Sequence, residues 1–347
     1  MKAYTLLLVL IAFVLSGAND LLWAKTTNQR PNFLLVVADD LGWTDIGSFG
    51  SEIKTPNLDA LADDGVKFTD FHVSVSCSPT RSMLMTGTDN HIAGLGTMSE
   101  LLTEELRKKP GYEGHLNDRV VTLAEVLSDG GYHTYMSGKW HLGEEPEHFP
   151  AARGFEKSFR MLYGGASYWN DMSGVIAVVQ EVAKYVKDDQ ELKSLPEDFY
   201  ATRNYTDILM DMIRDSRGDG KPFFAYLAYT AVHDPIHVPE PWLSLYKGEY
   251  NDGFEALKNR RAEGAKRAGI YPAKAKAAEL HPAASTWDSF SDDEKAFQSK
   301  AMEGYAGMVG NMDYHIGRVV DFLKDIGEYE NTVIISLSKS MRFTKYI

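Results

Sequence analysis

The sequence predicts an α/β protein with a large, mostly parallel central sheet flanked by helices. Continuous apolar runs, typical of strands buried on both faces, alternate along the chain with segments of helical spacing. Four of these runs are followed directly by polar motifs. Because ligands of open α/β sheets bind beyond the carboxyl ends of the strands, these motifs are expected to meet in one shared site.

The N-terminal half is expected to alternate strands and helices. Residues 32–38 form a continuous apolar run, which predicts a fully buried strand. Thr55 and Pro56 are suited to be the N-cap and the first residue of a helix that ends at Gly65. The other elements expected in this half are a strand at 66–74, helices at 77–87 and 122–128, and a strand at 132–136.

The C-terminal half combines surface loops with one long helix. Residues 144–200 are weakly patterned, and residues 247–284 predict a solvated helical excursion rather than a binding surface, because they are rich in charge. A capping box at Ser291 and Glu294 opens a long helix whose apolar stripe indicates core packing. The remaining elements are a helix at 206–214 and strands at 223–229 and 331–336.

Composition and the N-terminus predict an exported globular protein. Of the 347 residues, 44% are hydrophobic and 24% charged, as in folded domains, and the net charge of −13 argues against a nucleic-acid partner. Residues 1–24 resemble a secretory signal: Lys2 precedes an apolar run of about twelve residues, which is short of the ~20 that span a bilayer. We therefore expect a periplasmic or secreted protein without stable membrane insertion.

Cys77 is the only cysteine of the chain. A single thiol in an exported protein cannot form an internal disulfide, so Cys77 is either a buried spectator or is present for its chemistry. It opens the segment Cys77-Ser-Pro-Thr-Arg81, which is typical of a sharp turn into a helix. A helix N-terminus favours anions, and Arg81 would lie one turn later on the same side. The alternative is an ordinary loop with a buried thiol.

Asp39 and Asp40 are adjacent carboxylates at the end of the first buried strand. Two like charges so close together cannot both ionise cheaply, and a calcium or magnesium ion would remove the conflict. The alternative is a helix cap or a solvated loop.

Five motifs together resemble the sulfatase family over residues 31 to 336. They are Pro31 to Gly42, Thr55 to Asp59, the Cys-x-Pro-x-Arg motif at 77–81, Gly138 to Gly143, and Ala231 to Pro235. Within the family the chain is most similar to calcium-dependent bacterial arylsulfatases. The resemblance implies an alkaline-phosphatase-like α/β domain over residues 31–338 that cleaves small-molecule or carbohydrate sulfate esters.

The resemblance also implies a chemistry for individual residues. Cys77 would be oxidised by a separate maturation enzyme to formylglycine, whose hydrate attacks the sulfate ester. Asp39, Asp40 and Cys77 would bind a calcium ion, and Arg81 would steady the nucleophile. Lys139, His141 and His233 would contact the sulfate or exchange protons with the leaving group. Taken alone, each lone lysine or histidine is more often a surface or satisfied core residue.

The chain departs from the family pattern at Lys339 and Ser340. The family carries an Asp and an Asn there, which complete its metal site, and continues into a small C-terminal domain that we expect to be missing. We treat residues 339–347 as an atypical tail and expect it to be disordered. The alternative is that the Lys339 ammonium lies beside Asp39 and Asp40 in place of a metal. Three functions stay open: a sulfatase, a catalytically inactive relative, and a hydrolase of phosphate or phosphonate esters.

Overall fold

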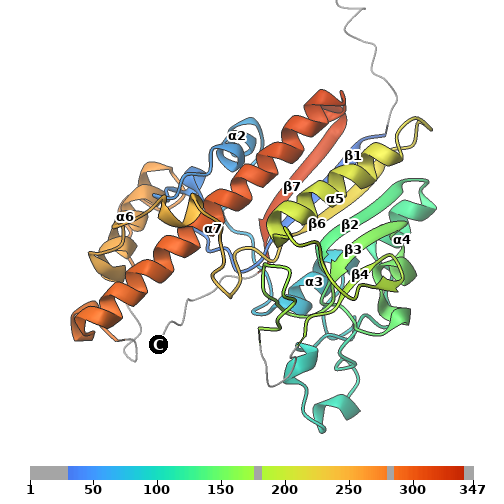
Figure 1. Ribbon diagram of the computed structural model, residues 1–347, viewed down its shortest axis with the longest axis horizontal. Helices are drawn as coiled ribbons and strands as arrows, with labels where there is room; N and C mark the ends of the chain where they lie inside the picture. Colours follow the sequence, from blue (N-terminus) through green and yellow to red (C-terminus); the bar gives the residue numbers. More distant parts are fainter. Residues whose placement is uncertain (1–29, 176–181, 280–284, 340–347) are drawn as a thin grey trace, which may run out of the picture.

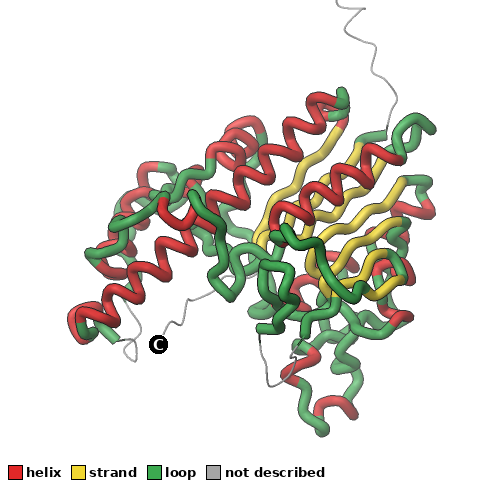
Figure 2. Tube along the Cα trace, in the orientation of Figure 1, coloured by secondary structure: helices red, strands yellow, loops and turns green. Residues whose placement is uncertain are grey.

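The computed structural model describes residues 30–175, 182–279 and 285–339. These residues form a seven-stranded sheet with the strand order β5-β4-β3-β2-β6-β1-β7, covered by helices on both faces (Figure 1; Figure 2). The predicted fold class is therefore confirmed. The proposed signal at residues 1–24 lies outside the described residues.

Five strands are parallel, and two short antiparallel strands extend one edge. The parallel strands are β1 (Asn32–Ala38), β2 (His133–Lys139), β3 (Lys157–Met161), β6 (Phe223–Ala228) and β7 (Thr332–Ser338). The antiparallel strands are β4 (Tyr185–Lys187) and β5 (Gln190–Glu191).

Six α-helices and several short 3₁₀ helices connect the described strands. The α-helices are α2 (Pro56–Asp64), α3 (Cys77–Thr86), α4 (Leu123–Asp129), α5 (Ala201–Asp215), α6 (Gly253–Arg267) and α7 (Asp292–Asp325). The 3₁₀ helices are Gly47–Phe49, Ser99–Leu101, Leu106–Lys108, Pro146–His148, Pro150–Arg153, Trp242–Ser244, Trp287–Ser289 and Tyr329–Asn331. Among the described residues, no helix has the length and apolar character needed to cross a bilayer.

Strand β1 is apolar throughout because it contributes to two cores. Leu34 and Val36 pack with residues of α5 and α7 on one face of the sheet, whereas Leu35 and Val37 pack with α3 and α4 on the other. All four side chains are nearly inaccessible to solvent.

The predicted capping box is also present at the start of α7. The Ser291 hydroxyl accepts a hydrogen bond from the Glu294 amide, and the Glu294 carboxylate accepts one from the Ser291 amide.

Two sequence expectations about local structure are wrong. Residues 66–74 form no strand; within the described chain no strand pairs with them, and Val66 and Phe68 are exposed. Apolar alternation alone does not make a strand without a neighbouring backbone to bond. The described part of residues 144–200 contains β3, β4 and β5, where the sequence predicted surface loops.

Helix α6 contacts the loop after β1 backbone to backbone, which yields a stability prediction. A Cβ at Gly264 would lie 1.9 Å from the Gly50 carbonyl oxygen. Although alanine is the better helix former by about 1 kcal/mol, we expect Gly264→Ala to lower the free energy of unfolding by about 1–3 kcal/mol, because the helix must move away. Urea unfolding measures this.

Gly310→Ala in α7 is the matched control, because a Cβ there meets no atom closer than 3.4 Å. It should be neutral or stabilising. Equal stability of the two variants would contradict the close approach of α6.

Candidate active site

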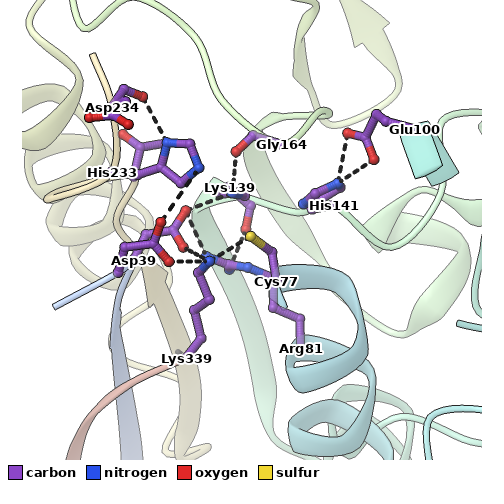
Figure 3. A network of polar contacts seen from close by, with 12 residues as sticks. Asp39, Cys77, Arg81, Glu100, Lys139, His141, Gly164, His233, Asp234 and Lys339 are labelled. Atoms are coloured by element: carbon purple, nitrogen blue, oxygen red, sulfur yellow. Dashed lines mark hydrogen bonds and ion pairs between the residues drawn. The ribbon is translucent and has the colours of Figure 1, made fainter. Parts of the chain in front are cut away.

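Polar side chains gather beyond the carboxyl ends of β1, β2, β6 and β7 (Figure 3). The structure brings together six residues that the sequence singled out, and places a seventh, His141, at their side. The six are Asp39, Asp40, Cys77, Arg81, Lys139 and His233. They come from segments up to two hundred residues apart, which the parallel sheet aligns at one end.

The two aspartates are held by the backbone that follows β1. The Asp39 amide donates to the Ala231 carbonyl at 2.8 Å, and the Val232 amide donates to the Asp39 carbonyl at 2.8 Å. Asp40 has a left-handed backbone with φ of 63°. This conformation is uncommon outside glycine and is found at functional positions. Both side chains are buried, so their charges need compensation inside the protein.

Cys77 is the first residue of α3, and its side chain is buried without a disulfide. Arg81 lies one helical turn later and is completely buried. Its Nη1 donates to the Lys139 carbonyl at 3.0 Å and to the Tyr226 hydroxyl at 2.9 Å. Its Nε and Nη2 have no hydrogen-bond partner in the described structure. Buried donors of this kind beside a helix N-terminus are suited to an oxyanion.

Lys139 ends β2 and bonds to Asp39 across the sheet. Its Nζ lies 2.6 Å from Asp39 Oδ2 and also donates to the Gly164 carbonyl. Burial lowers the pKa of Lys139, and the nearby Arg81 guanidinium acts in the same direction. Arg81 itself approaches Asp39 Oδ2 to 3.7 Å. Asp39 is therefore compensated from two sides by cations.

His141 lies next to this cluster and is paired with Glu100. Its Nε2 is 2.9 Å from Glu100 Oε1, and its Nδ1 has no partner in the described structure. Burial lowers the pKa of His141 to about 4, although Glu100 opposes the shift. Burial alone would raise the pKa of Glu100, but the hydrogen bond and charge of His141 lower it. At neutral pH His141 is thus an uncharged donor to an ionised carboxylate.

The lowered pKa of His141 predicts a stability change with pH. Between pH 6.5 and about 4 the unfolded histidine binds a proton that the folded one does not. We therefore expect the contribution of His141 to stability to rise with pH across this window and to fall on acidification, by at most about 3 kcal/mol. We expect His141→Gln, which keeps a donor for Glu100, to flatten the profile in unfolding titrations. His72→Gln is the control, because that ring is 78% exposed; an identical flattening there would contradict the assignment.

His233 closes the site on the side of β6. Its Nδ1 donates to the Asp234 carbonyl at 2.7 Å, because a carbonyl can only accept, and its Nε2 is 3.7 Å from Asp40 Oδ2. The Tyr168 hydroxyl donates to the backbone carbonyls of Thr230 and His233 and fixes this loop. The ring nitrogen of His233, the Cys77 sulfur and an Asp39 oxygen lie within 4.8 Å of one another, close enough to share one ion.

Lys339 lies in the site beside Asp39 and Asp40, as the alternative interpretation of the tail predicted. The expectation of a disordered tail is wrong for this residue, since its side chain is only 1% exposed. Its Nζ lies 2.6 Å from Asp39 Oδ1, 2.8 Å from Asp40 Oδ1 and 2.5 Å from Cys77 Sγ (Figure 3). Residues 340–347, including Ser340, lie outside the described residues.

Sequence reasoning missed two residues of this region. Glu100 lies in the short 3₁₀ helix Ser99–Leu101, in a part of the sequence without a clear pattern, and no sequence signal pairs it with His141. Tyr226 is one aromatic residue among several in β6, and only its register beside β2 brings its hydroxyl to Arg81.

Comparison with known proteins agrees with this geometry. The Sulfatase family model matches residues 31–338. The chain belongs to the sulfatase family. It is 43% identical over 323 residues to an uncharacterized sulfatase of Schizosaccharomyces pombe, covering 90% of this chain and 58% of that protein. It is 37% identical over 310 residues to an arylsulfatase of Klebsiella aerogenes, covering 89% of this chain and 66% of the relative.

A solved structure of another protein shares the fold of this chain. The crystal structure of Ps i-CgsB in complex with k-i-k-neocarrahexaose matches with a TM-score of 0.64 and 26% identity, covering 91% of this chain and 61% of that one. The chain therefore spans about three fifths to two thirds of the length of these relatives.

Proposed function

We propose that this chain hydrolyses sulfate esters, with small-molecule or carbohydrate sulfates as the substrate class. The observation that carries the proposal is the position of Cys77 at the N-terminus of α3, between buried cations, in a chain of the sulfatase family. The arylsulfatase relative supports the reaction class. The oligosaccharide complex of Ps i-CgsB supports a carbohydrate ester as one form of the substrate.

The surroundings of Cys77 fit a formylglycine at this position. Oxidation of Cys77 by a separate maturation enzyme would supply, as the aldehyde hydrate, an oxygen nucleophile toward sulfur. The α3 N-terminus favours negative charge at such an oxygen, and Arg81 offers two buried donors, Nε and Nη2, that have no hydrogen-bond partner in the described structure. Among the hydrogen bonds and ion pairs described for Arg81 and Lys139, the acidic partner is Asp39.

The residues around Cys77 are suited to hold a sulfate group and move a proton. Arg81 and Lys139 present positive charge from one side and would bind sulfate oxygens, in a site where burial strengthens each attraction. His233 is oriented by its Nδ1 bond to Asp234, which directs the other ring nitrogen toward the aspartate side of the site. We assign the proton transfer to the leaving alcohol to His233.

The donor set fits a calcium ion only if Lys339 moves. Asp39, Asp40 and Cys77 are the ligands that the resemblance implies, and carboxylate oxygens suit calcium. In the described structure the Lys339 ammonium takes the place between these three side chains. No step of the proposed reaction is therefore assigned to a metal.

The reaction class is tested with sulfate and phosphate esters of one chromogenic alcohol, using the 347-residue chain co-expressed with a formylglycine-generating enzyme. We expect faster release from the sulfate ester, because the Cys-x-Pro-x-Arg motif is typical of sulfatases. Faster release from the phosphate or phosphonate ester would favour the related hydrolase instead, and release from none would favour an inactive relative.

Export to the periplasm or the medium is part of the proposal. It is supported by the signal-like pattern of residues 1–24 and by the single cysteine. Fractionation of cells that express the full chain, with N-terminal sequencing of the product, tests it; an uncleaved chain in the cytoplasm would exclude export.

A further inference from the structure

We propose that the Lys339 ammonium occupies the position of the metal ion in this site and keeps calcium from binding between Asp39 and Asp40. The ammonium contacts both carboxylates and the Cys77 sulfur at 2.5 to 2.8 Å. These are the three side chains to which the family resemblance assigns the ion. A lysine carries positive charge and no acceptor, so it satisfies the carboxylates without becoming a metal ligand.

The position of Lys339 is set by the sheet and not by a chance side-chain conformation. Strand β7 pairs with β1 in continuous parallel register from Thr332 beside Asn32 to Ser338 beside Ala38. The Lys339 amide then donates to the Ala38 carbonyl at 3.2 Å, one residue before Asp39. The backbone of Lys339 is thereby fixed next to the aspartate pair, and its side chain is buried along its length.

Charge balance at the site disfavours an additional divalent ion. Asp39 and Asp40 already face three buried cations: Arg81, Lys139 and Lys339. The three cations outnumber the two carboxylates without any metal. A calcium ion placed between the same carboxylates would stand within a few ångströms of the ammonium, with little water to screen the repulsion. Calcium could enter only by displacing Lys339 from its partners.

The inference predicts a calcium affinity that depends on one side chain. By calorimetry with calcium chloride, the 347-residue chain should bind calcium at this site with a Kd above about 1 mM, whereas calcium sites of exported proteins typically have a Kd in this range or lower. Lys339→Gln removes the charge and supplies an amide oxygen, and should bind at least about 100-fold more tightly. Lys324→Gln is the control, because the Lys324 side chain is 53% exposed and lies at the C-terminal end of α7. This variant should bind calcium as weakly as the unchanged chain does.

Micromolar one-to-one binding by the unchanged chain, with no gain in Lys339→Gln, would overturn the inference. If Lys339→Gln does not fold, two measurements on the unchanged chain decide. Saturating calcium should not raise its melting temperature, because a ligand that does not bind the native state cannot stabilise it. Lys339 should stay protected from an amine-acetylating reagent, relative to Lys324, with and without calcium. A saturable rise in melting temperature, or labelling of Lys339 when calcium is added, would overturn the inference.

None of these readouts is hydrolysis. Failure of the proposed sulfatase activity would leave the Lys339 assignment standing, and calcium binding by the unchanged chain would leave the reaction class standing.

Discussion

Cys77→Ala should abolish the hydrolysis of sulfate esters, lowering kcat/KM by about 10⁴-fold or more. The substitution removes the atom from which the nucleophile is formed, and removing a nucleophile costs rates of this order in enzymes that work by covalent catalysis. The side chain is small and makes one described polar contact, to Lys339, so folding should be nearly unaffected. Initial rates with a chromogenic sulfate ester measure the first effect, and thermal melting measures the second.

Ser78→Ala is a matched control in the same turn of α3. Ser78 is 1% exposed, and its hydroxyl has no hydrogen-bond partner in the described structure. Ser78→Ala removes a buried polar atom of similar size, one residue away from Cys77. We expect the rate of ester hydrolysis to change only a few-fold. If Cys77→Ala retained activity, neither Cys77 nor a formylglycine formed from it could be the nucleophile.

The sheet could be predicted where strands are buried on both faces. Alternate residues of β1 pack into opposite cores, so the whole run is apolar. The strand can therefore be recognised without an alternating pattern. Strands β4 and β5 were missed because they are only three and two residues long and lie at one end of the strand order, where polar residues are tolerated. The segment 66–74 was misassigned for the opposite reason: its pattern suits a strand, but a strand needs a partner.

The site could be predicted from polar residues that follow buried strands, but its charge balance could not. The sequence places Asp39 and His233 after β1 and β6 and Lys139 at the end of β2, and the parallel sheet brings them together. Whether Lys339 frays or is buried depends on how far β7 continues beside β1. The register continues to Ser338 and the next amide still bonds to β1, which is a tertiary property without a local signal.

Arg261→Met should be the most destabilising substitution outside the core, lowering the free energy of unfolding by about 3–5 kcal/mol. Helix α6 was expected to be a solvated excursion, yet Arg261 is only 14% exposed and pairs with both Asp45 and Glu52. Removing one partner of a buried ion pair leaves the other charge uncompensated. Burial alone would raise the pKa of Glu52, but the hydrogen bonds and charge of Arg261 lower it, so Glu52 is ionised and would be stranded.

Arg261→Met should also perturb the active site, because Asp45 orders the turn after Asp40. The Asp45 carboxylate accepts the Gly42 amide at 2.6 Å and the Tyr305 hydroxyl at 2.5 Å. Without Arg261 this carboxylate loses its counter-charge, and the backbone that carries Asp39 and Asp40 loses its support. We therefore expect Arg261→Met to lower the rate as well as the stability, measured by urea unfolding and by ester hydrolysis below the unfolding transition.

Two comparisons separate the ion pair from the loss of a long side chain. Arg267→Met, on the exposed end of the same helix, should change stability by less than about 0.5 kcal/mol. The combination of Arg261→Met with Glu52→Gln should recover part of the loss, because a buried pair replaced on both sides costs less than one broken on one side. The double variant could instead be less stable than Arg261→Met by the full free energy that Glu52→Gln costs on its own. In that case the packing of the arginine stem, and not its charge, holds α6 against the loop after β1.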